Sequence, residues 1–185
     1  MSHRPYRSVL YIPGSKERAL EKAKGLAVDA IIFDLEDAVA AEEKANARVL
    51  LAETLAAGGY GPRAQIVRIN GFDTVWGEDD LATMAKVAPE AVLLPKVNSA
   101  ADIEALAAKL DAYPEAAETK IWAMMETPLG ILNALEIAQA PRMQGMVMGT
   151  NDLAKDLQTR SRPDRAPKHT TQSHTHHAAR AAGIA

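Results

Sequence analysis

Polar residues follow the ends of five apolar runs in this sequence, and both signs of charge are among them. An acidic group (DLED, 34–37) follows the second run, and Arg-Ile-Asn-Gly (68–71) follows the third. Lys96 follows the fourth run, Glu126 the fifth, and GTND (149–152) the sixth. In a parallel βα fold the carboxyl ends of the strands share one face, where active sites are found. These five endings therefore predict a shared polar pocket.

The residue types at these positions indicate chemistry on an oxygen-rich substrate. Glu126 and Asp152 come from adjacent predicted strands and could hold one Mg²⁺, which proteins bind through one or two carboxylates plus water and substrate. The acids at 34, 36 and 37 could add contacts through water. Arg68 offers a planar fork to a carboxylate or a developing enolate oxygen. The structural alternative, in which some of these acids form ion pairs with Arg68 or Lys96, stays open.

Six βα units must position these residues. The apolar runs predict buried parallel strands at 8–12, 30–34, 65–70, 91–95, 121–125 and 146–149. Helices are predicted between them, with Ser15, Ser99 and Thr127 as N-terminal caps. Alternating strands and helices predict an α/β fold, either a TIM-type (β/α) barrel or an open doubly wound sheet. Closed barrels of this type need roughly 250 residues, so we expect an incomplete barrel in 185 residues.

Composition excludes several classes of protein and site. The chain has 24 acidic and 21 basic side chains, a net charge of −3, and no cysteine. This balance argues against a nucleic-acid surface, and the lack of cysteine excludes disulfides and thiolate metal sites. No apolar run is long enough for a membrane helix, and no secretory signal is visible at the start. We therefore expect a cytoplasmic protein without a membrane partner.

The C-terminal segment departs from the βα pattern. Residues 168–177 read KHTTQSHTHH, without one apolar side chain. A helix that covers a sheet needs an apolar stripe, so we expect 158–185 to be a polar, poorly ordered segment. Residues 1–157 would then form the barrel portion that carries the site. The four histidines of this segment suggest a metal-binding tract, but an unstructured polar run is the favoured interpretation.

Six motifs in order resemble the citrate lyase β-subunit / malyl-CoA lyase family, of the HpcH/HpaI aldolase superfamily. They lie at 7–14, 34–37, 68–71, 94–96, 126–127 and 149–153. The resemblance implies a Mg²⁺-dependent C–C lyase that cleaves a β-hydroxyacyl-CoA such as malyl-CoA or citryl-CoA. It implies that Glu126 and Asp152 bind the metal and the substrate, and that Arg68 contacts the substrate near the reacting carbonyl. We expect Arg68 and Asp37 to be the catalytic residues. It also implies that three residues at the first strand and helix contact coenzyme A, namely Tyr11, Lys16 and Lys22.

Other functions remain open at this point. One is a malyl-CoA thioesterase, and another is a pyruvate-type aldolase with the same metal logic. A third is an inactive chain that only binds ligand or partner subunits, because family members carry two further strands and a C-terminal segment. A flavodoxin-like binding module ranks last, since no phosphate-binding glycine turn follows the first strand. Unpaired strand edges predict a homo-oligomer.

Overall fold

The computed structural model describes residues 6–160, 162 and 164–185. It divides into two compact units, and each is described by itself. The first runs to Leu93 and includes Leu110–Thr119; the second consists of Leu94–Lys109 and Lys120–Ala185. Among the described residues there are six strands, all parallel to their paired neighbours, as the sequence predicts. None of the described helices is long and apolar enough to cross a membrane.

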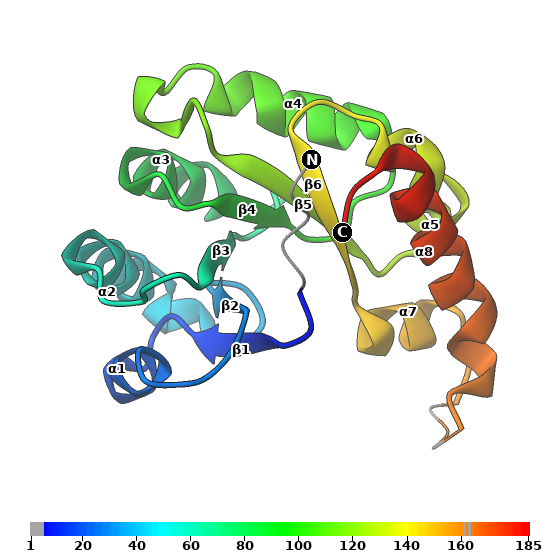
Figure 1. Cartoon of the computed structure of the whole chain (residues 1–185), viewed down its shortest axis with the longest axis horizontal. Helices are drawn as coiled ribbons and strands as arrows, with labels where there is room; N and C mark the ends of the chain where they lie inside the picture. Colours follow the sequence, from blue (N-terminus) through cyan, green and yellow to red (C-terminus); the bar gives the residue numbers. More distant parts are fainter. Residues whose placement is uncertain (1–5, 161, 163) are drawn as a thin grey trace. The chain divides into compact units, whose positions relative to one another are not determined.

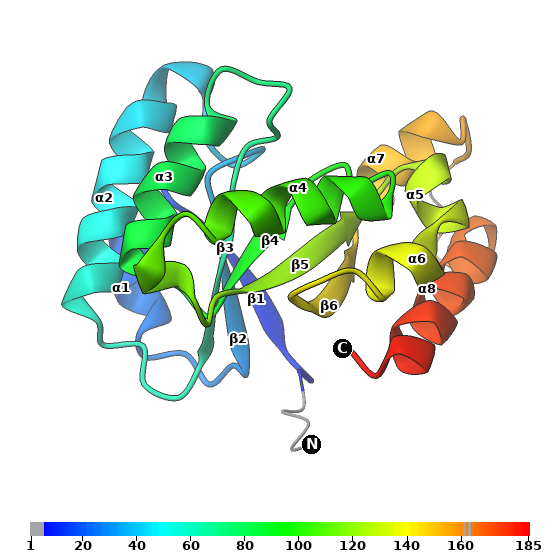
Figure 2. The same cartoon turned by 90° about the horizontal axis from the view of Figure 1, so that it is seen from above.

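The first unit is built on four strands that pair in chain order: β1 (Val9–Pro13), β2 (Ala30–Asp34), β3 (Ala64–Arg68) and β4 (Ala91–Leu94), of which only the last residue, Leu94, belongs to the second unit. Its helices are α1 (Glu17–Ala23), η1 (Ala41–Glu43), α2 (Lys44–Ala57), α3 (Gly77–Val87) and η2 (Pro114–Ala116). Figure 2 shows α1, α2 and α3 along one side of these strands. All five residues of β2 are buried, because this apolar run has neighbours on both edges and helices against its face.

The second unit contains two paired strands, β5 (Lys120–Met125) and β6 (Met143–Met148). Its helices are α4 (Ala100–Leu110), α5 (Pro128–Leu132), α6 (Ala134–Ala138), α7 (Thr150–Asp156), η3 (Ala166–Lys168) and α8 (His169–Ala182). Thr127 caps α5 as predicted, since its hydroxyl accepts the Gly130 N–H at 3.0 Å. The predicted cap at Ser15 is wrong, because α1 has no side-chain cap bond and its N-cap residue is Lys16.

Most of the C-terminal segment is helical, whereas the sequence predicts a poorly ordered segment. Residues 169–182 form α8, which packs with α5, α6 and β6 (Figure 1). Its buried side chains are Thr175, Ala178 and Ala179, and their spacing places them on one stripe of the helix. Small residues suffice here because they let the helix lie close to its neighbours. After the helix, Ala185 pairs with the edge of β6: its N–H donates to the Gln144 carbonyl and its carbonyl accepts the Met146 N–H, both at 2.9 Å.

Candidate functional site

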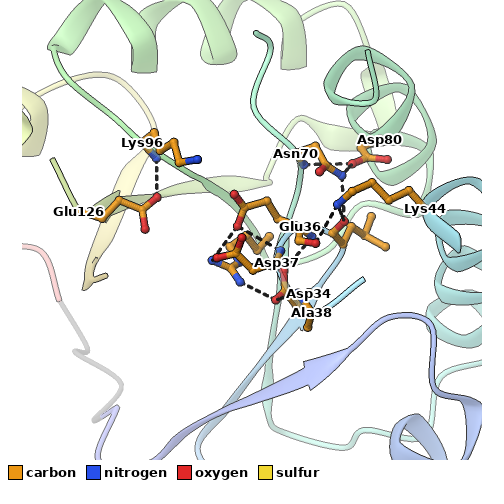
Figure 3. Close-up of polar contacts among 11 residues, drawn as sticks. Asp34, Glu36, Asp37, Ala38, Lys44, Asn70, Asp80, Lys96 and Glu126 are labelled. Carbon is orange, nitrogen blue, oxygen red and sulfur yellow. Dashed lines mark hydrogen bonds and ion pairs between the residues drawn. The ribbon is translucent and has the colours of Figure 1, made fainter. Parts of the chain in front are cut away.

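The first group of site residues surrounds Arg68, the last residue of β3. The register places it opposite Asp34, the last residue of β2, so both side chains leave the sheet at one level. Arg68 Nε donates to Asp34 Oδ1 at 2.8 Å, and Nη2 donates to Oδ2. Nη1 lies 2.9 Å from Glu36 Oε2 and 3.6 Å from Asp37 Oδ2. Three carboxylates therefore meet at one guanidinium; Figure 3 shows Asp34, Glu36 and Asp37 turned toward a common point.

Arg68 is fully charged in this setting. Burial by itself lowers the pKa of Arg68, but the hydrogen bonds and charge of Asp34, with the charge of Glu36, outweigh it and raise the pKa above its ordinary value. The Tyr11 ring lies 5.3 Å from the guanidinium carbon, a cation–π contact. Asp34 is buried, whereas the Asp37 side chain is 65% exposed. Asp37 is therefore the carboxylate of this group that solvent or a ligand reaches most easily.

A second layer of polar contacts fixes the turn that carries Glu36. The ammonium of Lys44, the first residue of α2, donates to the carbonyls of Leu35 at 3.0 Å and Glu36 at 2.8 Å. The Leu35 carbonyl also accepts from the Asn70 side chain at 2.9 Å. Asn70 in turn donates to the fully buried Asp80 at 2.6 Å. This layer joins the turn after β2 to the loop after β3 (Figure 3).

Glu126 lies in the second unit, directly after β5, and is only 2% exposed. Its Oε1 accepts the backbone N–H of Lys96 at 2.8 Å (Figure 3). Lys96 has a φ of 52°, the left-handed region that a non-glycine residue adopts rarely. Gly149 follows β6 and packs against the same side chain: a Cβ there would overlap Cβ and Oε2 of Glu126. The position of Glu126 is thus tightly restricted.

Asp152 lies in the first turn of α7, three residues after Gly149, and is half-buried. Among residues 6–160, 162 and 164–185, no three His, Asp or Glu side chains gather in a metal-binding arrangement. Mg²⁺ does not need such a set, because one or two carboxylates, water and substrate oxygens complete its shell. Glu126 and Asp152 follow two paired parallel strands and supply two hard oxygen donors. Their donor type and number would suit a magnesium ion, and their role as its ligands stays a prediction.

The three residues predicted to contact coenzyme A all lie in the first unit. Tyr11 is in β1 and 37% exposed. Lys16 precedes α1 and lies 3.6 Å from Glu43 Oε2, in an ion pair that both side chains share with solvent. Lys22 is exposed on α1. Both lysines are therefore accessible to an anionic ligand, and their role toward coenzyme A stays a prediction.

The structural alternative for Arg68 is confirmed, since the residue pairs with Asp34 and Glu36. A role of Arg68 toward substrate stays a prediction beside it. Sequence reasoning missed Lys44 and Asp80, which resemble ordinary helix-surface residues in the sequence. No sequence signal marks them, because charged residues at helical spacing usually lie on a solvated face. In the structure Arg48 Nε donates to Asp80 Oδ1 at 2.7 Å, so this face of α2 is not solvated.

Known proteins resemble this chain closely. The (3S)-malyl-CoA thioesterase of Cereibacter sphaeroides (strain ATCC 17025) is 59% identical over 186 residues, covering 100% of this chain and 63% of its own length. The citrate lyase subunit beta of Leuconostoc mesenteroides subsp. cremoris is 38% identical over 185 residues, covering 97% of this chain and 61% of its own. This chain thus spans less than two thirds of these relatives.

A solved structure gives the same fold. It is protein CitE from Mycobacterium tuberculosis in complex with magnesium, acetoacetate and coenzyme A, with a TM-score of 0.79 and 34% identity. The match covers 95% of this chain and 62% of that one. The predicted α/β class, with six βα units of a partial TIM-type barrel, is confirmed. The family model for HpcH/HpaI aldolase/citrate lyase matches residues 7–185. The chain belongs to the HpcH/HpaI aldolase/citrate lyase family.

Proposed function

We propose that this protein hydrolyses the thioester of (3S)-malyl-CoA, with Mg²⁺ as its metal. The observation that carries the proposal is the 59% identity to a (3S)-malyl-CoA thioesterase over the whole chain, against 38% for a citrate lyase subunit. The similarity favours hydrolysis over the C–C lyase that we expected first. The proposed hydrolysis consumes one water per thioester and releases malate and free coenzyme A.

In this proposal Arg68 binds an oxygen of the malyl group. A guanidinium has five N–H hydrogens; Asp34 accepts two of them, and Glu36 Oε2, 2.9 Å from Nη1, takes a third. One hydrogen on Nη1 and one on Nη2 therefore remain for a carboxylate or for the oxyanion that forms when water attacks the thioester. Because Asp34 fixes the plane of the guanidinium, these donors are already oriented before the substrate arrives.

Asp37 is the residue we assign to the attacking water. It is the most exposed carboxylate beside Arg68, so it can accept a proton from a water molecule that Asp34 cannot reach. Glu126 and Asp152 would hold the metal, which when bound supplies a positive charge that orients and polarises substrate oxygens. Tyr11, Lys16 and Lys22 would contact the coenzyme A portion, and the two lysines would face its phosphates.

The products decide between hydrolysis and cleavage. The protein is incubated with (3S)-malyl-CoA and Mg²⁺, and free thiol, glyoxylate and acetyl-CoA are measured in the same sample. Hydrolysis predicts one free thiol for each substrate consumed, with no glyoxylate. Equal amounts of glyoxylate and acetyl-CoA, with no free thiol, would refute the proposal and support the lyase.

The lyase is the second candidate, because citrate lyase β subunits share 34% to 38% identity with nearly the whole chain. The third is a chain that binds ligands without turnover. It predicts that Mg²⁺ and coenzyme A raise the melting temperature while neither thiol nor glyoxylate forms. Self-association stays a prediction, and light scattering of the purified protein tests it.

A further inference from the structure

Lys44 is a buried cation directly behind the turn that faces Arg68. Lys44 is the first residue of α2, and its ammonium donates hydrogen bonds to the carbonyls of Leu35 and Glu36. The Trp76 ring covers it, with the ring centre 5.1 Å from Nζ. A lysine is rarely buried without a specific partner, because removing its charge from water costs free energy.

The two carbonyl groups do not by themselves explain this burial. The Leu35 carbonyl also accepts from Asn70 at 2.9 Å, and the Glu36 carbonyl also accepts the Val39 N–H at 3.2 Å. Each carbonyl would keep one hydrogen-bond donor if the Lys44 ammonium were removed. The contribution that no neighbour duplicates is therefore the positive charge at this point of the turn.

The residues around Arg68 have too little positive charge to balance their carboxylates. Asp34, Glu36 and Asp37 bring three negative charges to the single positive charge of Arg68. Burial holds the pKa of Lys44 below its ordinary value, although the charges of Glu36, Asp80, Asp34 and Asp37 act to raise it. These carboxylates are thus close enough to Lys44 to interact with it electrostatically. With Lys44 protonated, the group of five side chains carries one net negative charge instead of two.

We propose that Lys44 is a positioning residue for the substrate site, which holds Glu36 against Arg68 and offsets the negative charge around the guanidinium. Lys44 acts through the turn and through Arg68, and it does not touch the substrate itself. An anionic substrate group would then approach a cluster with one negative charge fewer. For its kinetic part this inference rests on the proposed hydrolysis of malyl-CoA.

The test compares neutral and charged replacements. Lys44→Met keeps the aliphatic stem under Trp76 and removes the charge, and Lys44→Gln keeps an amide donor for the carbonyls. Both are expected to raise the KM for (3S)-malyl-CoA about tenfold, with kcat changed by less than about threefold. Lys44→Arg, which keeps the charge, is expected to bring KM back to within about threefold of the wild-type value.

A second measurement does not depend on activity. The Arg68 Nε–H gives a ¹H–¹⁵N resonance that is assigned by its loss in Arg68→Lys. Both neutral Lys44 variants are expected to shift it or speed its exchange with water. Lys24→Met is the matched control, since Lys24 also lies beside a ring, 5.8 Å from Tyr60, and 2.6 Å from a carboxylate, Glu21. It is expected to leave both the resonance and KM unchanged.

The outcomes separate this inference from the proposed function. If the wild type turns over no malyl-CoA, the proposed function fails, and the resonance alone decides about Lys44. If a folded Lys44→Met or Lys44→Gln keeps the wild-type Arg68 resonance and KM, the inference is overturned. If Lys44→Met does not fold, Lys44→Gln carries the test. A Lys44→Gln protein that equals Lys44→Arg in both measurements would also overturn the role of the charge.

Discussion

Replacement of Asp34 by asparagine removes one charge from the buried pair and changes almost no volume. Asp34 Oδ1 accepts from Arg68 Nε at 2.8 Å and from the Glu36 N–H at 2.9 Å. Oδ2 accepts from Arg68 Nη2 and from the Ala38 N–H at 3.2 Å. Whichever way the new amide turns, its NH₂ group faces one arginine donor and one backbone donor. Two hydrogen bonds are therefore lost in either orientation.

The size of the effect follows from the burial of the pair. Loss of one partner from a buried ion pair costs about 3–5 kcal/mol. We expect the lower end, about 3 kcal/mol, because Glu36 remains beside the guanidinium at 2.9 Å. For a protein of this length 1 kcal/mol corresponds to roughly 2–4 °C in melting temperature. Asp34→Asn should thus lower the melting temperature by about 6–12 °C.

Thermal and urea denaturation measure this loss, and Asp37→Asn is the matched control. Asp37 lies 3.6 Å from the same guanidinium but is 65% exposed, so its replacement should cost about 0–1 kcal/mol. Arg68→Met added to Asp34→Asn should cost less than the sum of the two single changes, because neither charge is then left alone. Equal melting temperatures for Asp34→Asn and Asp37→Asn would refute the reasoning.

Three further predictions concern single residues. Gly149→Ala should lower the free energy of unfolding by about 1–3 kcal/mol and weaken Mg²⁺ binding, measured by calorimetry, because the added methyl group overlaps Glu126. Gly25→Ala is the control and should change neither, because its Cβ meets its nearest neighbour at 3.8 Å. Burial and the charge of Glu21 raise the pKa of Tyr60 to about 12. The protonated phenol therefore stabilises the folded state fully below about pH 10, and this contribution is lost as pH rises toward 12. Tyr60→Phe has no phenol to titrate, so the variant should lose less stability than the wild type over this pH range. Denaturation series at several pH values check it, and parallel curves for both proteins would contradict it. Lys22→Ala should raise the KM for malyl-CoA several-fold with melting temperature unchanged, and an unchanged KM would remove Lys22 from the coenzyme A contacts.

The strands were predictable because a buried parallel strand must be apolar almost throughout. β2 has the predicted bounds, Ala30–Asp34, and its register with β3 explains why the polar residues that end both strands meet. The contact of Arg68 with Asp34 could therefore be expected from the order of the two strands together with the polar residues that end them. α8 could not, because its buried stripe consists of small residues and a threonine, which composition does not distinguish from a solvated segment.

The buried charged residues behind the candidate site were less predictable than the residues of the candidate site itself. Lys44, Arg48 and Asp80 lie on helices, where charged residues usually face water. Only the packing of α2 against α3 turns them inward, and that packing depends on the whole unit. A charged residue that is buried by tertiary contacts leaves no local pattern in the sequence.

Hydrolysis of malyl-CoA in H₂¹⁸O tests the central claim most directly. The protein, Mg²⁺ and (3S)-malyl-CoA react in labelled water, and the malate is analysed by mass spectrometry, with Glu126→Gln as the metal-site control. Thioester hydrolysis predicts one ¹⁸O in each malate and an equal amount of free coenzyme A, both lost in Glu126→Gln. Acetyl-CoA and glyoxylate as the products, or labelled malate formed equally well by Glu126→Gln, would contradict it.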